Sequence, residues 1–368
     1  GSMTKRNLQT KAELALPSKN LNEDIDFFTK KIGMRLDEIF PADDPSVAVI
    51  SGFGLRLRLT KGSSEPTGTI RILTDNIKQF EHLLPDQIAP NGVKVQFIEN
   101  TSKPTMPKTN HDFVVRRLSD QAPWVIGRAG MHYRDLIPSR LGGSIIASHI
   151  RIPDGGPVPD MVHYHTVGFQ LIFCYKGWVD LVYEDQGLPF RLTEGCCVIQ
   201  PPKIRHKVLF ASDNIEVIEI GVPAEHVTTI DHEMALPNDQ INRERTFDGQ
   251  RFVHHKVEEA KWEPFRLKQF KSRDTSIAEN TGNVAGVHVV KFTGGDSFWS
   301  AHDTDILFNF VMSGNMILEG EGKQTSNLEP GDAFVIPPHM KTKYSGCSED
   351  LELLEVSLPG VFNTTIFR

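Results

Sequence analysis

An internal repeat constrains the fold of this chain more than any other feature of its sequence. The segment YRDLIPSRLGGSIIASHIRIPDGG, which begins at Tyr133, aligns without gaps with SRDTSIAENTGNVAGVHVVKFTGG, which begins at Ser272. Further on, EGCCVIQPP aligns with PGDAFVIPP and places Gly195 opposite Gly331. The offset changes only from 139 to 136 residues, as deletions in loops would produce. Two copies of a unit this long predict tandem domains and not a solenoid.

Both copies consist of short apolar runs separated by Gly, Pro and Asp. Examples are FQLIFCYKGWVDLVYE, CCVIQPP and IEVIEIG in the first copy. This pattern is typical of an all-β sandwich or barrel. We therefore predict a mainly β protein with one barrel in residues 110–240 and a second barrel in residues 241–368.

Residues 1–109 have a different pattern, which predicts a small α+β module of the order β-α-β-β-β. AELALP indicates a strand, and LNEDIDFFTKKIG indicates an amphipathic helix with Leu21, Ile25, Phe28 and Ile32 on its apolar face. MRLDEIF, SVAVIS and LRLRLT follow as strands, and a shorter β-α-β unit reaches VKVQFIE. We expect the stretch 100–109, which contains two prolines, to be a linker.

Composition excludes several classes of protein. The net charge is −7 and no basic block is present, which argues against nucleic acid as a partner. No apolar run reaches the length of a membrane span. The start, GSMTKRNLQTK, predicts no signal peptide, and the four cysteines show no paired spacing. A reduced, cytoplasmic setting is the expectation.

The stretch VHYHTVGFQLIFCYKGW carries His163, His165 and Gln170, and His206 follows Pro201-Pro202. With Gly156, Gly177 and Gly195 these residues resemble the two motifs of the cupin superfamily, and the tandem copy resembles a bicupin, over about residues 128–360. The resemblance implies two jelly-roll barrels and a metal site formed by His163, His165, Gln170 and His206. The sequence departs from the family's motifs at three places. Six residues separate Gly156 from His163, where the family usually has five. Gln170 stands where the family usually has Glu, and Lys203 stands where it usually has Gly.

Strand geometry is consistent with this ligand set. Residues i and i+2 of a strand point to one face, so His163 and His165 can reach the same ion. Imidazoles with an amide oxygen suit one Fe(II), Ni(II), Co(II), Mn(II) or Zn(II) ion per chain, but not Ca(II). The alternative is that these residues persist in a barrel that holds no metal.

The second copy serves as an internal control, because a feature kept in both copies is expected to serve the fold. Its counterparts of the four ligands are Ser300, His302, Leu307 and Thr342, which predict a degenerate, metal-free barrel. Arg134-Asp135 matches Arg273-Asp274, which predicts a structural ion pair or turn, and His149 matches His288, which predicts a structural histidine.

Three residues that differ between the copies are candidates for a substrate pocket: Arg151, Cys174 and Arg205. Arg151 could bind an anionic group or be a solvated strand residue. Cys174 could line the same cavity as Gln170, but a small buried core residue is the more ordinary interpretation.

The N-terminal module resembles the glyoxalase-like (vicinal oxygen chelate) proteins over about residues 12–99. That resemblance implies histidine and glutamate metal ligands on the strands. The chain has no histidine before His82, which falls in the second expected helix, and Glu13 alone is not a site. We expect a module for packing or dimerisation, with a homodimer as one possibility.

The ligand set also limits the chemistry. A neutral shell leaves the ion its full charge, which favours a small anionic, chelating substrate. Gln170 cannot act as a general base, as glutamate could. The first hypothesis is an Fe(II) dioxygenase without an organic cofactor, by analogy with cupins. The alternatives are a non-redox lyase, isomerase or hydrolase that uses Zn, Mn or Ni as a Lewis acid, and a non-enzymatic protein that binds a small molecule.

Overall fold

The computed structural model describes residues 10–31, 33–52, 54–66, 68–88, 94–100, 103–120, 124–127 and 130–368. It consists of two compact units. One unit comprises residues 1–104 with the short stretches 161–166 and 225–234, and the other comprises 105–160, 167–224 and 235–368. Among the described residues, no helix is long and apolar enough to cross a membrane.

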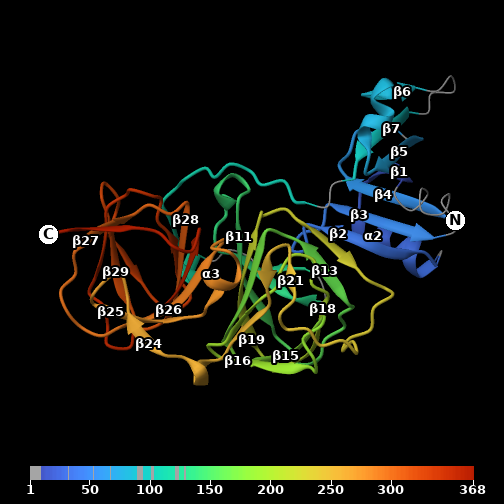
Figure 1. Cartoon of the computed structure of the whole chain (residues 1–368). Helices are drawn as coiled ribbons and strands as arrows, with labels where there is room; N and C mark the ends of the chain where they lie inside the picture. Colours follow the sequence, from blue (N-terminus) through green and yellow to red (C-terminus); the bar gives the residue numbers. More distant parts are fainter. Residues whose placement is uncertain are drawn as a thin grey trace. The chain divides into compact units, whose positions relative to one another are not determined.

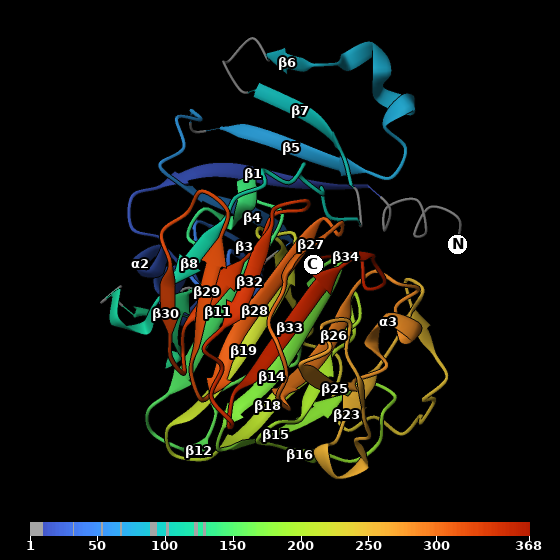
Figure 2. The same ribbon diagram turned by 90° about the vertical axis from the view of Figure 1, so that its left-hand side faces the viewer.

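The N-terminal module has the predicted order β-α-β-β-β. Its elements are β1 (Thr10–Ser18), α2 (Leu21–Asp26), a π-helical turn (Phe27–Lys31), β2 (Arg35–Phe40), β3 (Val47–Gly52), β4 (Leu55–Lys61), β5 (Thr69–Thr74), a 3-10 helix (Ile77–Leu83), β6 (Asp86–Ile88) and β7 (Lys94–Glu99). Their order in the sheet is β2-β3-β4-β1-β5-β7-β6, part of which is visible in Figure 2. The second expected helix is thus a short 3-10 helix, and His82 on it is exposed.

The helix forms where its amphipathic pattern predicts it. Asn20 caps it, because its Oδ1 accepts a hydrogen bond from the Glu23 N–H at 3.2 Å. Leu21 is buried, and Ile25 and Phe28 pack on the core of the module. Ile32, the fourth expected apolar position, lies outside the described residues.

The fold class predicted for the rest of the chain is confirmed: the structure is mainly β, with sheets consistent with two jelly-roll barrels (Figure 1). The strands of the first barrel are β9 (Val125–Ile126), β10 (His132–Asp135), β11 (Ile146–Ile152), β12 (Gly156–Pro157), β13 (His163–Thr166), β14 (Phe169–Lys176), β15 (Trp178–Tyr183), β16 (Phe190–Thr193), β17 (Cys197–Ile199), β18 (His206–Ala211), β19 (Ile215–Val222) and β20 (Val227–Ile230). A 3-10 turn (Arg140–Gly142) lies between β10 and β11.

The second barrel repeats this plan. Its elements are β24 (Trp262–Pro264), β25 (Phe270–Asp274), α3 (Ile277–Asn280), β26 (Gly286–Phe292), β27 (Trp299–His302), β28 (Ile306–Ser313), β29 (Met316–Gly320), β30 (Ser326–Leu328), β31 (Ala333–Val335), β32 (Thr342–Ser345), β33 (Glu352–Leu358) and β34 (Thr364–Phe367). The remaining elements lie before each barrel: β8 (Val114–Arg116) and a 3-10 turn (Leu118–Asp120), then β21 (Thr246–Phe247), β22 (Gln250–Arg251), β23 (Val253–His255) and a 3-10 turn (Val257–Glu259).

The two barrels exchange strands. β8, which precedes the first barrel, pairs with β31 of the second, and β23, which precedes the second barrel, pairs with β17 of the first. β17 and β31 are the repeat-related CCVI and DAFV segments, so the exchange is reciprocal. Each barrel therefore completes a sheet of the other, and the boundaries predicted at residues 109 and 240 stay predictions.

Apolar side chains of both barrels form one shared core. It contains Phe169, Leu171 and Ile218 from the first barrel and Val287 and Phe308 from the second. The inner faces of the same strands carry Cys174 and Val217 into a separate core inside the first barrel. Because side chains alternate across a strand, neighbouring residues of one strand join different cores.

Candidate metal centre

Three histidines of the first barrel lie close enough together to hold one ion. His163 and His165 lie on β13 and His206 begins β18. One ring nitrogen of each lies within 4.8 Å of those of the other two, and all three side chains are buried. The structure thus brings together the three histidines that the sequence predicted.

The second ring nitrogen of each histidine lies at hydrogen-bond distance from an oxygen. Nδ1 lies 2.7 Å from Met161 O in His163, 2.8 Å from Thr228 Oγ1 in His165 and 2.9 Å from Ile204 O in His206. A carbonyl oxygen can only accept, so Nδ1 of His163 and of His206 carries the hydrogen and Nε2 is the ligand atom. Metal-binding histidines are usually held in this way, by a hydrogen bond from the nitrogen that does not bind the ion. The residues present therefore fit a divalent metal ion.

Gln170 belongs to a directed chain of hydrogen bonds inside the first barrel. Tyr183 Oη donates to Gln200 Oε1 (2.6 Å), Gln200 Nε2 donates to Gln170 Oε1 (2.8 Å), and Gln170 Nε2 donates to Glu219 Oε1 (3.2 Å). With the Tyr183 hydroxyl as the donor at one end, Gln200 and Gln170 each accept through Oε1 and donate through Nε2, so the chain fixes the orientation of both amides. Gln170 Oε1 thus already accepts one hydrogen bond and has one lone pair left. Its role as a fourth metal ligand stays a prediction.

Tyr183 connects this chain of hydrogen bonds to His206 of the metal centre. Its ring is fully buried and stacks on His206 with the ring centroids 5.5 Å apart. Burial, and then the charge of Glu219, raise the pKa of Tyr183 well above its ordinary value. The phenol therefore keeps its proton at neutral pH and remains a donor to Gln200.

Sequence reasoning missed Tyr183, Gln200 and Glu219. The signal for Glu219 was available, because IEVIEIG predicts a strand on which residues 217, 219 and 221 share a face. Val217 on that face lies in the inner core of the first barrel. The inward direction of Glu219 therefore follows once Val217 is assigned to the interior.

The positions of Cys174 and Arg151 can be explained by the fold, through the burial of Cys174 and the contacts of Arg151. Cys174 is fully buried, and burial, followed by the charge of Glu194, raises the pKa of its thiol to about 12. Arg151 lies 3.5 Å from Glu216 and 4.7 Å from the ring centroid of Trp124. Glu216 is three residues from Glu219 on β19, so Arg151 faces away from the interior that holds Gln170. Their roles in substrate binding stay predictions without support from these contacts.

Arg205, the third pocket candidate, lies directly before His206. Its Nη1 donates to Lys203 O at 3.0 Å, and its backbone N–H donates to Glu184 Oε1 at 3.0 Å. Arg205 is therefore tied to the turn that precedes His206, and its contact with a substrate stays a prediction.

Arg134 and His149, which both copies keep, lie at the interface of the barrels. Arg134 donates to His149 Nδ1 (2.9 Å) and to Gly331 O of the second barrel (2.8 Å), and His149 Nε2 donates to Glu216 (2.7 Å). Asp135 accepts from Ile137 N–H and pairs with Arg140. The structural role fits, but Arg134 pairs with a histidine and a carbonyl and not with Asp135.

The second barrel has an arginine in its interior. Arg266 Nη2 donates to Glu355 Oε1 at 2.5 Å, and Glu355 is the counterpart of Glu219. His302 Nε2 lies 2.7 Å from Ile336 O and donates to it, so the nitrogen that would bind an ion is already used. The metal-free character of this barrel stays a prediction.

Glu13 of the N-terminal module is also fully committed. Its buried carboxylate accepts from Arg56 (3.3 Å), Arg58 (2.7 Å) and Arg71 (2.8 Å). A carboxylate bound by three guanidinium groups is a structural ion-pair network, which agrees with the expectation that Glu13 is not a metal site. The glyoxalase-like character of the module stays a prediction.

Comparison with known proteins identifies the fold. No protein-family model matches the sequence, and no curated protein sequence matches it. Among solved structures, a salicylate 1,2-dioxygenase from Pseudaminobacter salicylatoxidans is similar with a TM-score of 0.53 and 14% identity over 72% of this chain and 90% of that chain. A variant of the oxalate decarboxylase of Bacillus subtilis is similar with a TM-score of 0.52 and 14% identity over 71% and 82%. The tandem barrels of this chain thus have the bicupin fold.

Proposed function

We propose that this protein is a metal-dependent bicupin enzyme that holds one Fe(II) ion and oxygenates a small anionic substrate. The observation that carries the proposal is the group formed by His163, His165 and His206, with each Nδ1 bonded to an oxygen. Three imidazoles leave coordination positions for substrate and oxygen, as catalytic sites require. When bound, such an ion polarises its ligands and supplies redox chemistry.

The residues of the chain have separate tasks in this proposal. The histidines are neutral ligands, so an anionic chelating substrate meets the full charge of the ion. Tyr183 and Gln200 orient the Gln170 amide toward Glu219. Glu219 is then the carboxylate near the site that can take a proton from a substrate hydroxyl, a task that an amide cannot perform.

A second candidate is a lyase that uses Mn, Zn or Ni as a Lewis acid. It draws on the bicupin fold shared with the oxalate decarboxylase, for which Mn(II) centres are described, and on the carboxylate of Glu219 beside Gln170, to which this candidate assigns the proton transfer. Fold similarity at this level of identity does not separate the two reactions.

Metal analysis combined with oxygen uptake distinguishes the candidates. The purified protein is assayed for metal and then tested with catechols, β-diketones and hydroxy acids in an oxygen electrode and under nitrogen. We expect oxygen uptake that requires iron and is lost in His163→Ala. His302→Ala, which changes the corresponding residue of the second barrel, is the matched control and is expected to keep activity. Turnover under nitrogen would favour the lyase. A protein that retains no metal after incubation with the ion would contradict both candidates.

A further inference from the structure

A second cavity lies on the flank of the first barrel, apart from the histidines. Its volume is about 620 Å³, within the usual range for small-molecule sites, and it is lined by β16, by the loop before β16 and by the segment that leads into the second barrel. None of the three histidines of the metal centre lines it. Tyr183 separates the two, because its ring stacks on His206 at 5.5 Å and lies 4.7 Å from Phe252, which lines the cavity.

Aromatic rings form the middle of the cavity. Phe190 and His254 stack with centroids 4.2 Å apart and an interplanar angle of 27°. Burial, and then the charge of Lys256, lower the pKa of His254 to about 4, so the ring is a neutral imidazole at pH 7. Phe252 lies 6.2 Å from Phe190 with an interplanar angle of 60°, so these rings form an angled aromatic wall against which a planar ligand can pack.

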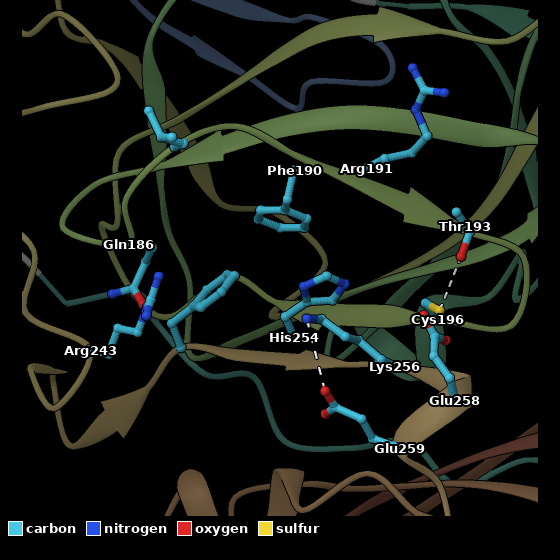
Figure 3. A pocket seen from close by; sticks show the side chains of 12 residues that line it. Gln186, Phe190, Arg191, Thr193, Cys196, Arg243, His254, Lys256, Glu258 and Glu259 are labelled. Carbon is cyan, nitrogen blue, oxygen red and sulfur yellow. Dashed lines mark hydrogen bonds and ion pairs between the residues drawn. The ribbon is translucent and has the colours of Figure 1, made fainter.

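The two ends of the cavity differ in charge (Figure 3). The figure shows Gln186 and Arg243 at one end, Phe190 and His254 in the middle, and Cys196, Glu258 and Glu259 toward the other end. Lys256 lies 3.9 Å from Glu259 and is thereby partly neutralised. A positive end and an acidic end favour a ligand with one negative group over a dianion.

The polar groups at the Arg243 end lack protein partners. Gln186 is 8% exposed, and its Nε2 has no hydrogen-bond acceptor among the described residues. Arg243 has no ion pair with any described residue, whereas Arg191, the other arginine of the cavity, is bonded to Asp180 at 2.9 and 3.2 Å. A buried amide without a partner is costly, and a guanidinium group is the preferred partner of a carboxylate.

We propose that this cavity is a second ligand site, which binds a small planar monocarboxylate. The carboxylate lies at Arg243 and Gln186, and the ring lies against Phe190, Phe252 and His254. The proposal is independent of the reaction proposed for the metal centre. It gives the cavity an occupant that matches its neutral aromatic middle and its single unpaired cation.

Benzoate is the probe for this site, and isothermal titration calorimetry of the full chain is the measurement. We expect saturable binding that Arg243→Gln weakens about tenfold or more, the usual effect of losing a charged hydrogen-bond partner. Arg191→Gln is the matched control, because Arg191 is already paired, and it should change the affinity less than about threefold. Benzamide and acetate, which lack the charge or the ring, should bind more weakly than benzoate.

The variant His163→Ala separates this cavity from the metal centre. Binding at the cavity should persist in it, and Arg243→Gln should still weaken it. If benzoate binding disappears in His163→Ala and is unchanged in Arg243→Gln, the probe binds at the histidines and the proposal is wrong. Absence of saturable binding at millimolar benzoate, or equal losses in Arg243→Gln and Arg191→Gln, would overturn it as well.

Discussion

Replacing Gln170 by glutamate tests the hydrogen-bond chain inside the first barrel. Gln170 Nε2 lies 3.2 Å from Glu219 Oε1, so Gln170→Glu places two carboxylates at that separation. Two unit charges 3.2 Å apart repel by roughly 1 to 5 kcal/mol for effective dielectric constants from about 80 down to about 20. We expect the pair to avoid this repulsion by sharing one proton, which raises the pKa of the pair in the folded state.

The sign of the pH effect follows from linkage. The carboxyl of an unfolded chain has a pKa of about 4.3, so the folded variant binds more protons than the unfolded chain above that pH. The free energy of unfolding of Gln170→Glu, relative to wild type, should therefore fall as the pH rises above about 4. The loss is complete above the raised pKa and amounts to the roughly 1 to 5 kcal/mol of the repulsion.

Urea unfolding of the metal-free protein at several values between about pH 4 and pH 8 measures this difference. Gln170→Leu, which copies Leu307 of the second barrel, is the matched control. It loses two hydrogen bonds, at a cost of roughly 1 to 3 kcal/mol, without adding a charge, so its deficit should not grow with pH in the same way. Parallel curves for Gln170→Glu and wild type would refute the reasoning and place Gln170 away from Glu219 in solution.

The same variant bears on the metal. A carboxylate oxygen is at least as good a ligand as an amide oxygen, so Gln170→Glu should retain the ion. Above the raised pKa it should weaken binding of an anionic substrate, because one positive charge at the site is cancelled. Equal substrate affinity and turnover in both proteins would show that the neutral shell is not what selects the substrate.

Three further changes have definite expected outcomes. His163→Ala should lower the metal content from one ion per chain to near zero while circular dichroism stays native, and His302→Ala should keep one ion; a content near two in wild type would contradict the single site. Arg266→Met leaves the buried Glu355 without its partner and should destabilise the protein by about 3 to 5 kcal/mol in urea, with metal content unchanged once folded; a loss below about 1 kcal/mol would refute the role of that pair. Deletion of residues 1–109 removes β2, which pairs with β20 at Thr228, so it should reduce solubility and loosen the acceptor of His165 Nδ1; sedimentation and metal retention measure this, and an unchanged soluble, metal-loaded protein would contradict it.

The repeat made the two barrels predictable because it combines a constant offset with strand patterns. The location of His163 and His165 on one face of the barrel was equally predictable, because side chains alternate along a strand. The reciprocal exchange of β8 and β23 was not accessible, because nothing in a three-residue strand specifies which barrel it joins. For the same reason the sequence did not show that Arg134 reaches across to Gly331.

Side-chain partners were harder to predict than backbone positions. The family resemblance assigned Gln170 to the metal site, but the acceptor of its amide hydrogen lies on β19, distant in the chain. The cavity beside Phe190 and His254 escaped notice because its walls come from the turn before β16 and from the segment after residue 240. Such sites depend on the path of loops, which carry no periodic signal.

Comparison of the two copies of the repeat has a limit that Glu219 makes plain. Glu219 and Glu355 occupy corresponding positions, so the rule that shared residues serve the fold would assign both a structural role. Yet Glu355 is bonded to the guanidinium group of Arg266, whereas Glu219 accepts from the amide of Gln170, whose counterpart is Leu307. Glu355 is therefore committed to an ion pair with an arginine, whereas Glu219 holds an amide that the second barrel does not have. A residue kept in both copies is therefore evidence for a purely structural role only when its partners are kept as well.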